Sequence, residues 1–568
     1  MGDFAHDQDW RVLVAAKKES QQSAIPPEWL IDSKVLHELK QCPGGRLLEP
    51  SPAKKSTILT DEELEITERY SATDLLEKLG KGELTSVAVT RAFCKRAAVA
   101  QQLTSCLTEI FFEKAIERAE ELDNYLKQNN KPMGPLHGLP ISCKDTFRVK
   151  GFHATGGFLT NLKEPAAESN SALIDILLDA GAVLYAKTNV PQTLMTADSE
   201  NHIFGRTLNP HNLNLTAGGS SGGEGSLVAF RGCPLGIGTD IAGSIRIPAM
   251  CCGVYGFKPT ANRLPYAGQT NPPGLIRVPG SIEPSAGPLG HSVQDLRVAM
   301  AAMMQLRPWL YDADAYDIPW RDPLPLEDAA AKPDGLGRKL TIGILPEDPA
   351  YPLHPPVRRA VQTAAAKLEK AGHRIVWLPP DADREVGLGM RIAFQFFGVG
   401  WEGGVPQLAE PPVVSVAVGS HPFSKDPPPV PRDPSPIRFL GKLHAARGAF
   451  ADAWRRAWKE NGLDVVLAPG ALSPAVPLDT YGLPTYTVMW NLLDFPVCLI
   501  PFGKVAKSLD PTPVKALSAF VPDYDPEALD GAPVGIQIVA PHLRDEECLQ
   551  AAQLIDRDIR SSVPERER

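Results

Sequence analysis

Apolar residues return every three or four positions through residues 62–127, as at Leu75, Leu76 and Leu79. This spacing places them along one face of a helix. The same stretch is rich in Glu, Lys, Leu and Ala, which are good helix formers. We therefore predict several helices across it.

Short apolar runs without helical spacing predict buried strands. The first covers residues 138–143 and ends at Lys144, and the second covers residues 182–186, directly after a predicted helix at 172–181. Further strands are predicted at residues 340–345, 374–378, 464–467, 497–500 and 534–539, with helices at 357–371 and 450–461. Helices alternating with strands indicate an α/β fold, in which a large mixed central sheet is covered by helices on both faces.

Residues 405–437 break this pattern, because they are dense in proline and have no periodicity. We interpret them as a surface loop or lid. A disordered linker between two domains is the alternative, but helices and strands resume beyond it without a change in composition. We therefore divide the chain into an N-terminal helical arm (1–74), a main domain (75–560) and a polar tail (561–568).

The composition narrows the classes of partner. The net charge of −9 over 568 residues provides no basic surface for nucleic acid or an anionic membrane. The first thirty residues lack the apolar core of a signal peptide, and no run approaches the ~18 apolar residues of a membrane span. Nine scattered cysteines without a Cys-x-x-Cys pair favour reduced thiols over disulfides or zinc. We expect a cytoplasmic protein without a bound metal.

Two glycine-rich segments that carry serines lie close together, at residues 218–223 and 238–244, with no histidine between them. Glycine allows positive φ and lets backbone N–H groups turn inward, which suits a pocket for a negatively charged oxygen. We predict one composite site with a serine nucleophile and a base supplied from elsewhere in the chain.

Other interpretations of these glycines fit less well. A Walker loop needs a lysine where Glu224 stands, and a dinucleotide-binding turn needs a strand where residues 209–217 are polar and turn-forming. The G-x-S-x-G match around Ser221 leaves an α/β-hydrolase as an alternative, with Ser221 as nucleophile and His542 as the late histidine. This alternative also lacks the strand that should precede the serine.

Lys144 is a candidate base at the end of a predicted buried strand. A lysine accepts a proton only when neutral, and an ordinary pKa of ~10.4 leaves about one in a thousand neutral near pH 7. Burial would have to lower the pKa by ~3 units. The structural alternative is an ion pair between Lys144 and Asp145.

Together these residues resemble the amidase signature family. Lys144 precedes Ser220 by 76 residues, and Ser244 follows Ser220 by 24. Supporting segments lie at residues 181–191, 204–210, 256–260 and 533–537, and the similarity extends over roughly residues 75–555. Within the family the chain is most similar to the fungal general amidases, also called acetamidases, and more distantly to fatty acid amide hydrolases.

The resemblance implies an amidase that acts on linear amides without a cofactor. Ser244 would attack the carbonyl carbon and form an acyl-enzyme, Ser220 would relay the proton after a cis peptide bond, and neutral Lys144 would be the base. The oxyanion hole would consist of the N–H groups of Ile241, Ala242, Gly243 and Ser244. Ala242 departs from the glycine that is common in the family, but it retains the N–H group.

The resemblance also implies a substrate pocket formed by Leu194, Met195, Thr196, Gly218 and Gly219. Core packing is the alternative for the first three. We expect Ser221, Asp240 and Arg246 to support the loops, and Thr239 to orient the oxyanion segment. Cys251 and Cys252 would pack on a helix after Ser244.

Three alternative functions remain at this point. The same acyl chemistry serves esters and carbamates. The glutaminase-type subunit of an amidotransferase shares the motifs, although the N-terminal region argues against it. A catalytically silent binding protein would have lost one of Lys144, Ser220 and Ser244, yet all three are present. A homodimer would be ordinary for the family.

Overall fold

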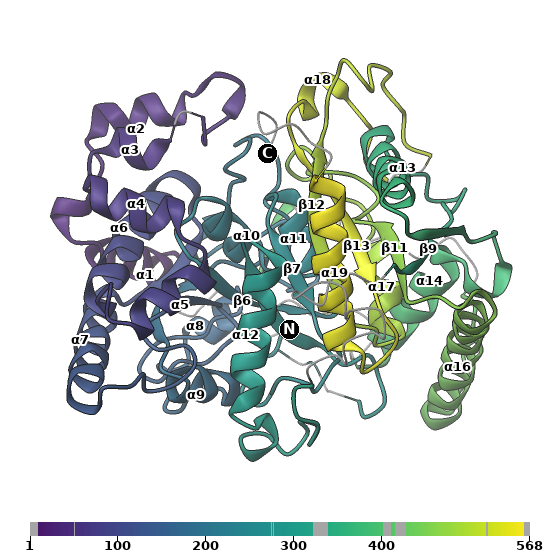
Figure 1. Cartoon of the computed structure of the whole chain (residues 1–568), viewed down its shortest axis with the longest axis horizontal. Coiled ribbons are helices and arrows are strands. Elements are labelled where there is room, and N and C mark those ends of the chain that lie inside the picture. Colours follow the sequence, from purple (N-terminus) through teal and green to yellow (C-terminus); the bar gives the residue numbers. More distant parts are fainter. Residues whose placement is uncertain are drawn as a thin grey trace.

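The computed structural model describes residues 10–49, 51–273, 275, 278–321, 339–400, 410–414, 428–517 and 521–561. Within these ranges the chain forms an 11-stranded sheet in the order β1-β3-β2-β6-β8-β7-β12-β13-β11-β9-β10, and β4 and β5 form a separate pair (Figure 1). The strands are β1 (Leu107–Ile110), β2 (Pro140–Lys144), β3 (Val183–Thr188), β4 (Glu200–Asn201), β5 (Gly205–Arg206), β6 (Leu235–Asp240), β7 (Tyr255–Lys258), β8 (Ser285–Gly290), β9 (Thr341–Ile344), β10 (Arg374–Trp377), β11 (Val465–Pro469), β12 (Val497–Lys504) and β13 (Pro533–Val539). The predicted α/β fold with a large mixed sheet is confirmed.

Parallel and antiparallel neighbours share this sheet. β2 runs parallel to both β3 and β6, and β9 runs parallel to β10 and β11. The central pairs from β6 through β8, β7, β12 and β13 to β11 are antiparallel. The carboxyl ends of β2, β3 and β6 therefore meet at one edge of the sheet, beside the glycine-rich loops.

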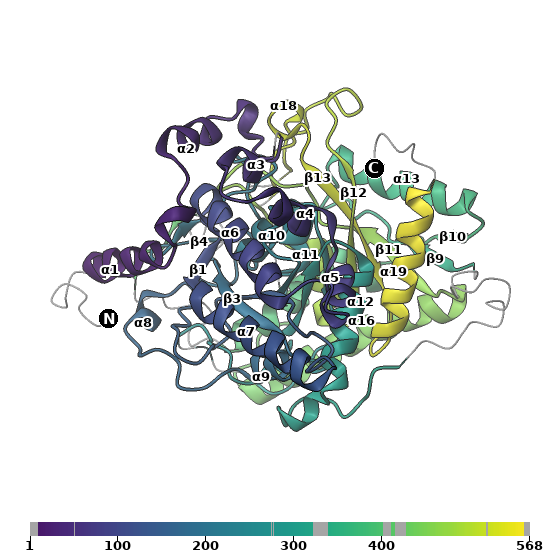
Figure 2. The ribbon, with the colours of Figure 1, turned by 60° about the vertical axis from the view of Figure 1, so that its left-hand side comes forward.

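Helices cover both faces of the sheet (Figures 1 and 2). One face packs against α5 (Ala72–Gly80), α9 (Ala172–Asp179), α12 (Val293–Gln305) and α19 (Asp545–Arg560). The other packs against α10 (Gly222–Ala229), α11 (Arg246–Cys251), α14 (Val386–Phe397), α16 (Pro436–Asn461) and α17 (Thr485–Leu492). Helix α13 (Pro355–Lys370) contributes side chains to both cores. The apolar faces of the strands are thus buried on both sides, which explains their continuous apolar runs.

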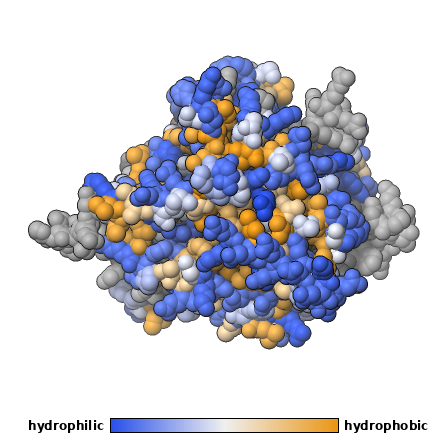
Figure 3. Space-filling view, turned by 90° about the vertical axis from the view of Figure 1, so that its left-hand side faces the viewer, coloured by the Kyte–Doolittle hydropathy of each residue, from blue (hydrophilic) through white to orange (hydrophobic). Residues whose placement is uncertain are grey.

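The N-terminal helices lie beside β1 and β3. They and the remaining short helices are α1 (Trp10–Ser23), η1 (Pro27–Trp29), α2 (Ser33–Lys40), η2 (Pro43–Gly45), α3 (Pro52–Ser56), α4 (Asp61–Arg69), α6 (Ser86–Thr104), α7 (Phe112–Asn129), α8 (Leu159–Leu162), η3 (Pro308–Leu310), η5 (Ala382–Arg384), η6 (Gly398–Gly400) and α18 (Pro526–Leu529). Trp29 packs on Phe112 with ring centroids 5.7 Å apart, and Lys17 pairs with Glu109 on β1. Hydrophilic side chains cover most of this side of the molecule, and apolar ones appear in scattered groups (Figure 3).

Several boundaries differ from the prediction. β1 interrupts the stretch 62–127 that was predicted to be helical, and α16 begins at Pro436 instead of residue 450. β6, β7 and β8 were not predicted, and residues 238–240 continue β6 instead of forming a loop. Glycines in these strands interrupt the apolar pattern by which strands are predicted. They are required by close packing, since a Cβ on Gly287 would lie 2.1 Å from the carbonyl oxygen of Phe257.

The predicted lid and tail lie largely outside the described residues. Of residues 405–437 the structure describes 410–414 and 428–437, the last two belonging to α16, and of the tail it describes only residue 561. All nine cysteines lie in the described ranges as free thiols, with Cys251 and Cys252 buried as predicted. Of the helices in these ranges, none has the length and apolarity to cross a bilayer.

Candidate active site

Lys144 ends β2, a strand whose five residues are all buried. Its Nζ lies 2.7 Å from Ser220 Oγ and 2.8 Å from Thr239 Oγ1. Burial lowers the pKa of Lys144 to about 7, although the carboxylates of Asp240 and Glu224 act in the opposite direction. The predicted alternative of a pair with Asp145 is wrong, because Asp145 pairs with Lys187 at 3.1 Å.

Ser220 follows a cis peptide bond from Gly219, as predicted. The two preceding glycines are required by close contacts: a Cβ on Gly218 would lie 2.7 Å from Pro248 Cα, and one on Gly219 would lie 2.4 Å from the carbonyl oxygen of Thr196. Gly218 also has a φ of 78°. The loop is therefore fixed between two segments that leave room only for hydrogen at these positions.

Ser221 connects the two serine segments. Its N–H donates to the carbonyl oxygen of Ser244 at 3.1 Å, and its hydroxyl donates to the carbonyl oxygen of Thr239 at 3.3 Å. These bonds hold the backbone of Ser244 beside the Ser220 loop. They agree with the predicted supporting role for Ser221.

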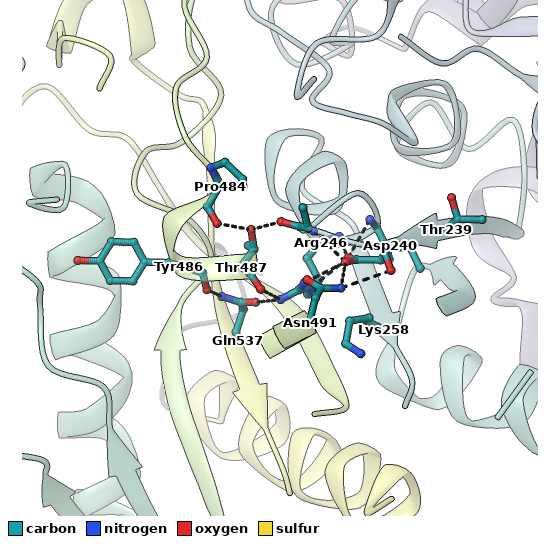
Figure 4. Close-up of polar contacts among 12 residues, drawn as sticks. Thr239, Asp240, Arg246, Lys258, Pro484, Tyr486, Thr487, Asn491 and Gln537 are labelled. Carbon is teal, nitrogen blue, oxygen red and sulfur yellow. Dashed lines mark hydrogen bonds and ion pairs between the residues drawn. The ribbon is translucent and has the colours of Figure 1, made fainter. Parts of the chain in front are cut away.

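Asp240 organises the turn that carries Ser244 (Figure 4). Its carboxylate accepts from the N–H of Gly243 at 2.8 Å and of Ile245 at 3.1 Å, and from the guanidinium of Arg246 at 2.9 and 3.0 Å. Burial alone would raise the pKa of Asp240, but the buried guanidinium of Arg246 holds it well below its usual range. The predicted structural roles of these two residues are thus consistent with their contacts.

Arg246 also reaches segments that are distant in sequence (Figure 4). It donates to the carbonyl oxygen of Thr487 at 3.0 Å, to Gln537 Oε1 at 2.9 Å and to Asn491 Oδ1 at 2.7 Å. α17 and β13 therefore help to hold the turn, and the sequence carried no local signal of this.

The backbone between Asp240 and Ile245 presents N–H groups to the site. Gly243 has a φ of 127°, and a Cβ there would lie 2.4 Å from Thr487 Oγ1. Its N–H is engaged by Asp240, whereas the N–H groups of Ile241, Ala242 and Ser244 donate to no acceptor among the described residues. These three donors are thus available to a bound group.

A cavity opens to solvent above Ser220, Ser244 and Thr239. Leu194 and Met195 line it, as the resemblance implied. Its other apolar lining residues are Ile241, Tyr266, Pro272, Leu275, Val278, Ile282, Pro284, Phe396 and Phe397. Of the other three predicted pocket residues, Thr196, Gly218 and Gly219, none lines the described cavity, because they lie behind Ser220 and shape its loop.

The cavity wall next to Leu194 is hydrogen-bonded to the proline-rich segment 405–437 through residues 410–413. Gln192 Nε2 donates to Glu410 Oε1 at 2.7 Å, and the N–H of Val413 donates to Gln192 Oε1 at 3.0 Å. Glu410 also accepts from the N–H of Leu159 at 2.6 Å. This buried connection was not predicted, and it links the described part of the segment to the cavity.

The α/β-hydrolase alternative is wrong. Residues 209–217 contain no strand, only isolated bridges at Leu215 and Thr216, and the Ser221 hydroxyl is occupied by a backbone carbonyl. His542 is partly exposed and pairs with Asp494 at 3.2 Å.

Comparison with known proteins gives a consistent result. A family model described as Amidase matches residues 88–399 and 436–549. A protein named Amidase from Gibberella moniliformis is 40% identical over 555 residues, covering 96% of this chain and 98% of that protein. One named Acetamidase from Emericella nidulans is 38% identical over 559 residues, covering 96% and 97%. A solved structure of a fatty acid amide hydrolase has a TM-score of 0.83 and 30% identity, covering 97% of this chain and 95% of that one.

Proposed function

The chain is an amide hydrolase of the amidase signature family, and we propose that it forms an acyl-enzyme on Ser244 with Ser220 as proton relay and Lys144 as base. The observation that carries this proposal is the buried contact of 2.7 Å between Lys144 Nζ and Ser220 Oγ. A lysine whose pKa is about 7 is neutral in a large fraction of molecules at neutral pH. A base with a pKa near the working pH can both accept a proton and return it.

In the first step Ser244 Oγ attacks the amide carbonyl carbon. Its proton passes to Ser220 as the Ser220 proton passes to Lys144 Nζ, which becomes an ammonium. The contact of Nζ with Thr239 Oγ1 at 2.8 Å supports this path, because it occupies one amine hydrogen and leaves the lone pair for Ser220.

The tetrahedral intermediate places a negative charge on the former carbonyl oxygen. We assign its stabilisation to the N–H groups of Ile241, Ala242 and Ser244, whereas Gly243 shapes the turn and donates to Asp240. One such preorganised donor is worth ~3–4 kcal/mol.

The proton then returns from Lys144 through Ser220 to the leaving nitrogen. This step is needed because an amine anion is a very poor leaving group. Ammonia or an amine departs, and water activated by the same relay hydrolyses the acyl-enzyme to the carboxylic acid.

Substrates with an apolar acyl group fit the cavity. Most of its lining residues are aliphatic or aromatic, and they extend well beyond the immediate surroundings of Ser244. We therefore propose amides of medium-length or aromatic carboxylic acids as substrates, bound with the acyl group against Leu194 and Phe397.

The test is Ser244→Ala, with hydrolysis of hexanamide and benzamide and labelling by a fluorophosphonate as readouts. Both should be abolished while the far-UV spectrum and the thermal transition are retained. Ser281→Ala is the matched control, because Ser281 lines the same cavity and should remain labelled at the wild-type rate. Amide turnover by Ser244→Ala would refute the proposal.

A further inference from the structure

A second carboxylate lies behind the base. Glu224, in the first turn of α10, is fully buried. It accepts a hydrogen bond from Ser142 Oγ at 2.6 Å and one from Thr188 Oγ1 at 2.8 Å, and no ion pair to it occurs within the described residues. A buried carboxylate held only by two neutral hydroxyls is costly, and such groups are kept where they serve a purpose.

Strand geometry sets this carboxylate on the same face of the sheet as Lys144. Ser142 lies two residues before Lys144 on β2, and side chains two apart point to the same face. Thr188 is the register partner of Lys144 on β3, and Gly236 is the partner of Ser142 on β6. A Cβ on Gly236 would lie 2.0 Å from Glu224 Oε2, so that glycine makes room for the carboxylate.

The other titratable groups that act on Glu224 are neutral at working pH. They are Cys106, Cys143, Cys233 and Tyr185, and burial raises the pKa of each above its ordinary value. Of the two carboxylates that act on Lys144, Asp240 has the larger effect, and it is paired with Arg246 at 2.9 Å. Glu224 is the other anion that acts on Lys144, and it has no cationic ion-pair partner of its own among the described residues.

We propose that Glu224 is a positioning residue that tunes Lys144 from behind, stabilising the ammonium that forms when Lys144 takes the proton of Ser220. This inference rests on the proposed role of Lys144 as base. Glu224 contacts neither Ser220 nor Ser244 and takes no proton from either of them. Its charge acts through the buried, low-dielectric space beside the strand.

The pH ranges of the two groups agree with this role. Burial raises the pKa of Glu224 to about 7, so the carboxylate becomes charged over the range in which Lys144 becomes neutral. The base is therefore ready for a proton when the anion that stabilises its protonated form is present.

The experiment measures the rate of fluorophosphonate labelling of Ser244 against pH in Glu224→Gln, a substitution of nearly equal size. Loss of the anion lowers the pKa of Lys144. The acid limb of the pH profile, where the labelling rate rises with pH, should therefore move to lower pH by about one unit. The plateau rate should fall about threefold, because a weaker base accepts the proton less readily. The KM for benzamide should not change.

Three further variants keep the test decisive. Glu224→Asp retains the charge and should restore the acid limb to within a few tenths of a unit of wild type. Asp295→Asn removes another buried carboxylate, which is held by Thr73 on α5 away from the site, and should leave the limb unmoved. Ser142→Ala removes one of the two hydrogen bonds to the Glu224 carboxylate and should move the acid limb in the same direction as Glu224→Gln. It provides a second test if Glu224→Gln folds poorly.

An unmoved acid limb in folded Glu224→Gln or Ser142→Ala would overturn the inference, as would an equal movement in Asp295→Asn. This failure is distinct from failure of the proposed function. If Ser244 were not the nucleophile, labelling would persist in Ser244→Ala whatever residue 224 was.

Discussion

Lys144 Nζ lies 2.8 Å from the hydroxyl of Thr239, on the neighbouring strand β6. This contact restrains the end of the flexible Lys144 side chain between β2 and β6. Nζ is therefore held within hydrogen-bond distance of Ser220. We predicted that Thr239 orients the oxyanion segment, and in the structure its hydroxyl contacts Lys144, the proposed base.

Thr239→Val keeps the shape of the side chain and removes the hydroxyl. We expect kcat to fall about tenfold, equivalent to ~1.4 kcal/mol, because Lys144 loses the hydrogen bond that orients it. Thr239→Ser keeps the hydroxyl and should stay within about threefold of wild type. Equal activity of the valine and serine variants in a benzamide assay would contradict the role of the hydroxyl.

The activity of the wild-type enzyme should rise with pH through about 7. Burial lowers the pKa of Lys144 to about 7, and the base works only in its neutral form, which dominates above that pKa. A profile of kcat/KM from pH 5 to 9 should show this limb. Lys144→Met should lose at least about a hundredfold at pH 8 and should lack the limb. A wild-type limb below pH 5 would instead indicate a carboxylate base.

Asp240→Asn should lower the free energy of unfolding by ~3–5 kcal/mol, because the buried guanidinium of Arg246 loses its counter-charge. Since Arg246 lowers the pKa of Asp240, the stabilisation by this pair is complete above the unfolded pKa of ~3.9 and is lost as pH falls below it. Urea unfolding at pH 7 measures the loss. Asp452→Asn, at an exposed ion pair on α16, should leave the urea midpoint close to that of the wild type. Similar losses for the two variants would contradict this expectation.

Gly243→Ala should inactivate the enzyme. The new Cβ would lie 2.4 Å from Thr487 Oγ1, at a φ of 127° that L-residues rarely adopt, so the turn carrying Ser244 must shift. Fluorophosphonate labelling should fall by more than about a hundredfold, since the oxyanion donors move with the turn. Gly441→Ala on α16, where a Cβ meets nothing within 4 Å, should label at the wild-type rate. Normal labelling of Gly243→Ala would show that the turn tolerates a side chain.

The strands that the sequence predicted are those with side chains at nearly every position. β2 and β3 are buried throughout, as are the first four residues of β12, so a continuous run of apolar residues marks each of them in the sequence. β6 was missed because Gly236 and Gly238 interrupt its pattern. The structure gives the reason: Glu224 and Ser221 occupy the space that side chains at those two positions would fill.

The site was predictable only where it coincides with motifs of the family. Lys144 and the two serines were identified from their order and spacing, and the cis bond before Ser220 was expected with them. The bond between Gln192 and Glu410 joins residues 218 positions apart, and no local pattern encodes it. In the same way, no local pattern relates Glu224 to Lys144, because their proximity depends on the register of three strands.

The turn that carries Ser244 is completed late in synthesis of the chain, because Arg246 depends on partners far along the sequence. Its partners on α17 and β13 leave the ribosome roughly 240 to 290 residues after it, as the separations of 241 and 291 residues show. Until α17 arrives, the guanidinium beside the turn that carries Ser244 has only Asp240 as a hydrogen-bond partner, and the bond to Gln537 forms only when β13 follows. A growing or prematurely terminated chain therefore carries all three chemical groups without a finished turn to use them, and hydrolytic competence coincides with completion of the sheet.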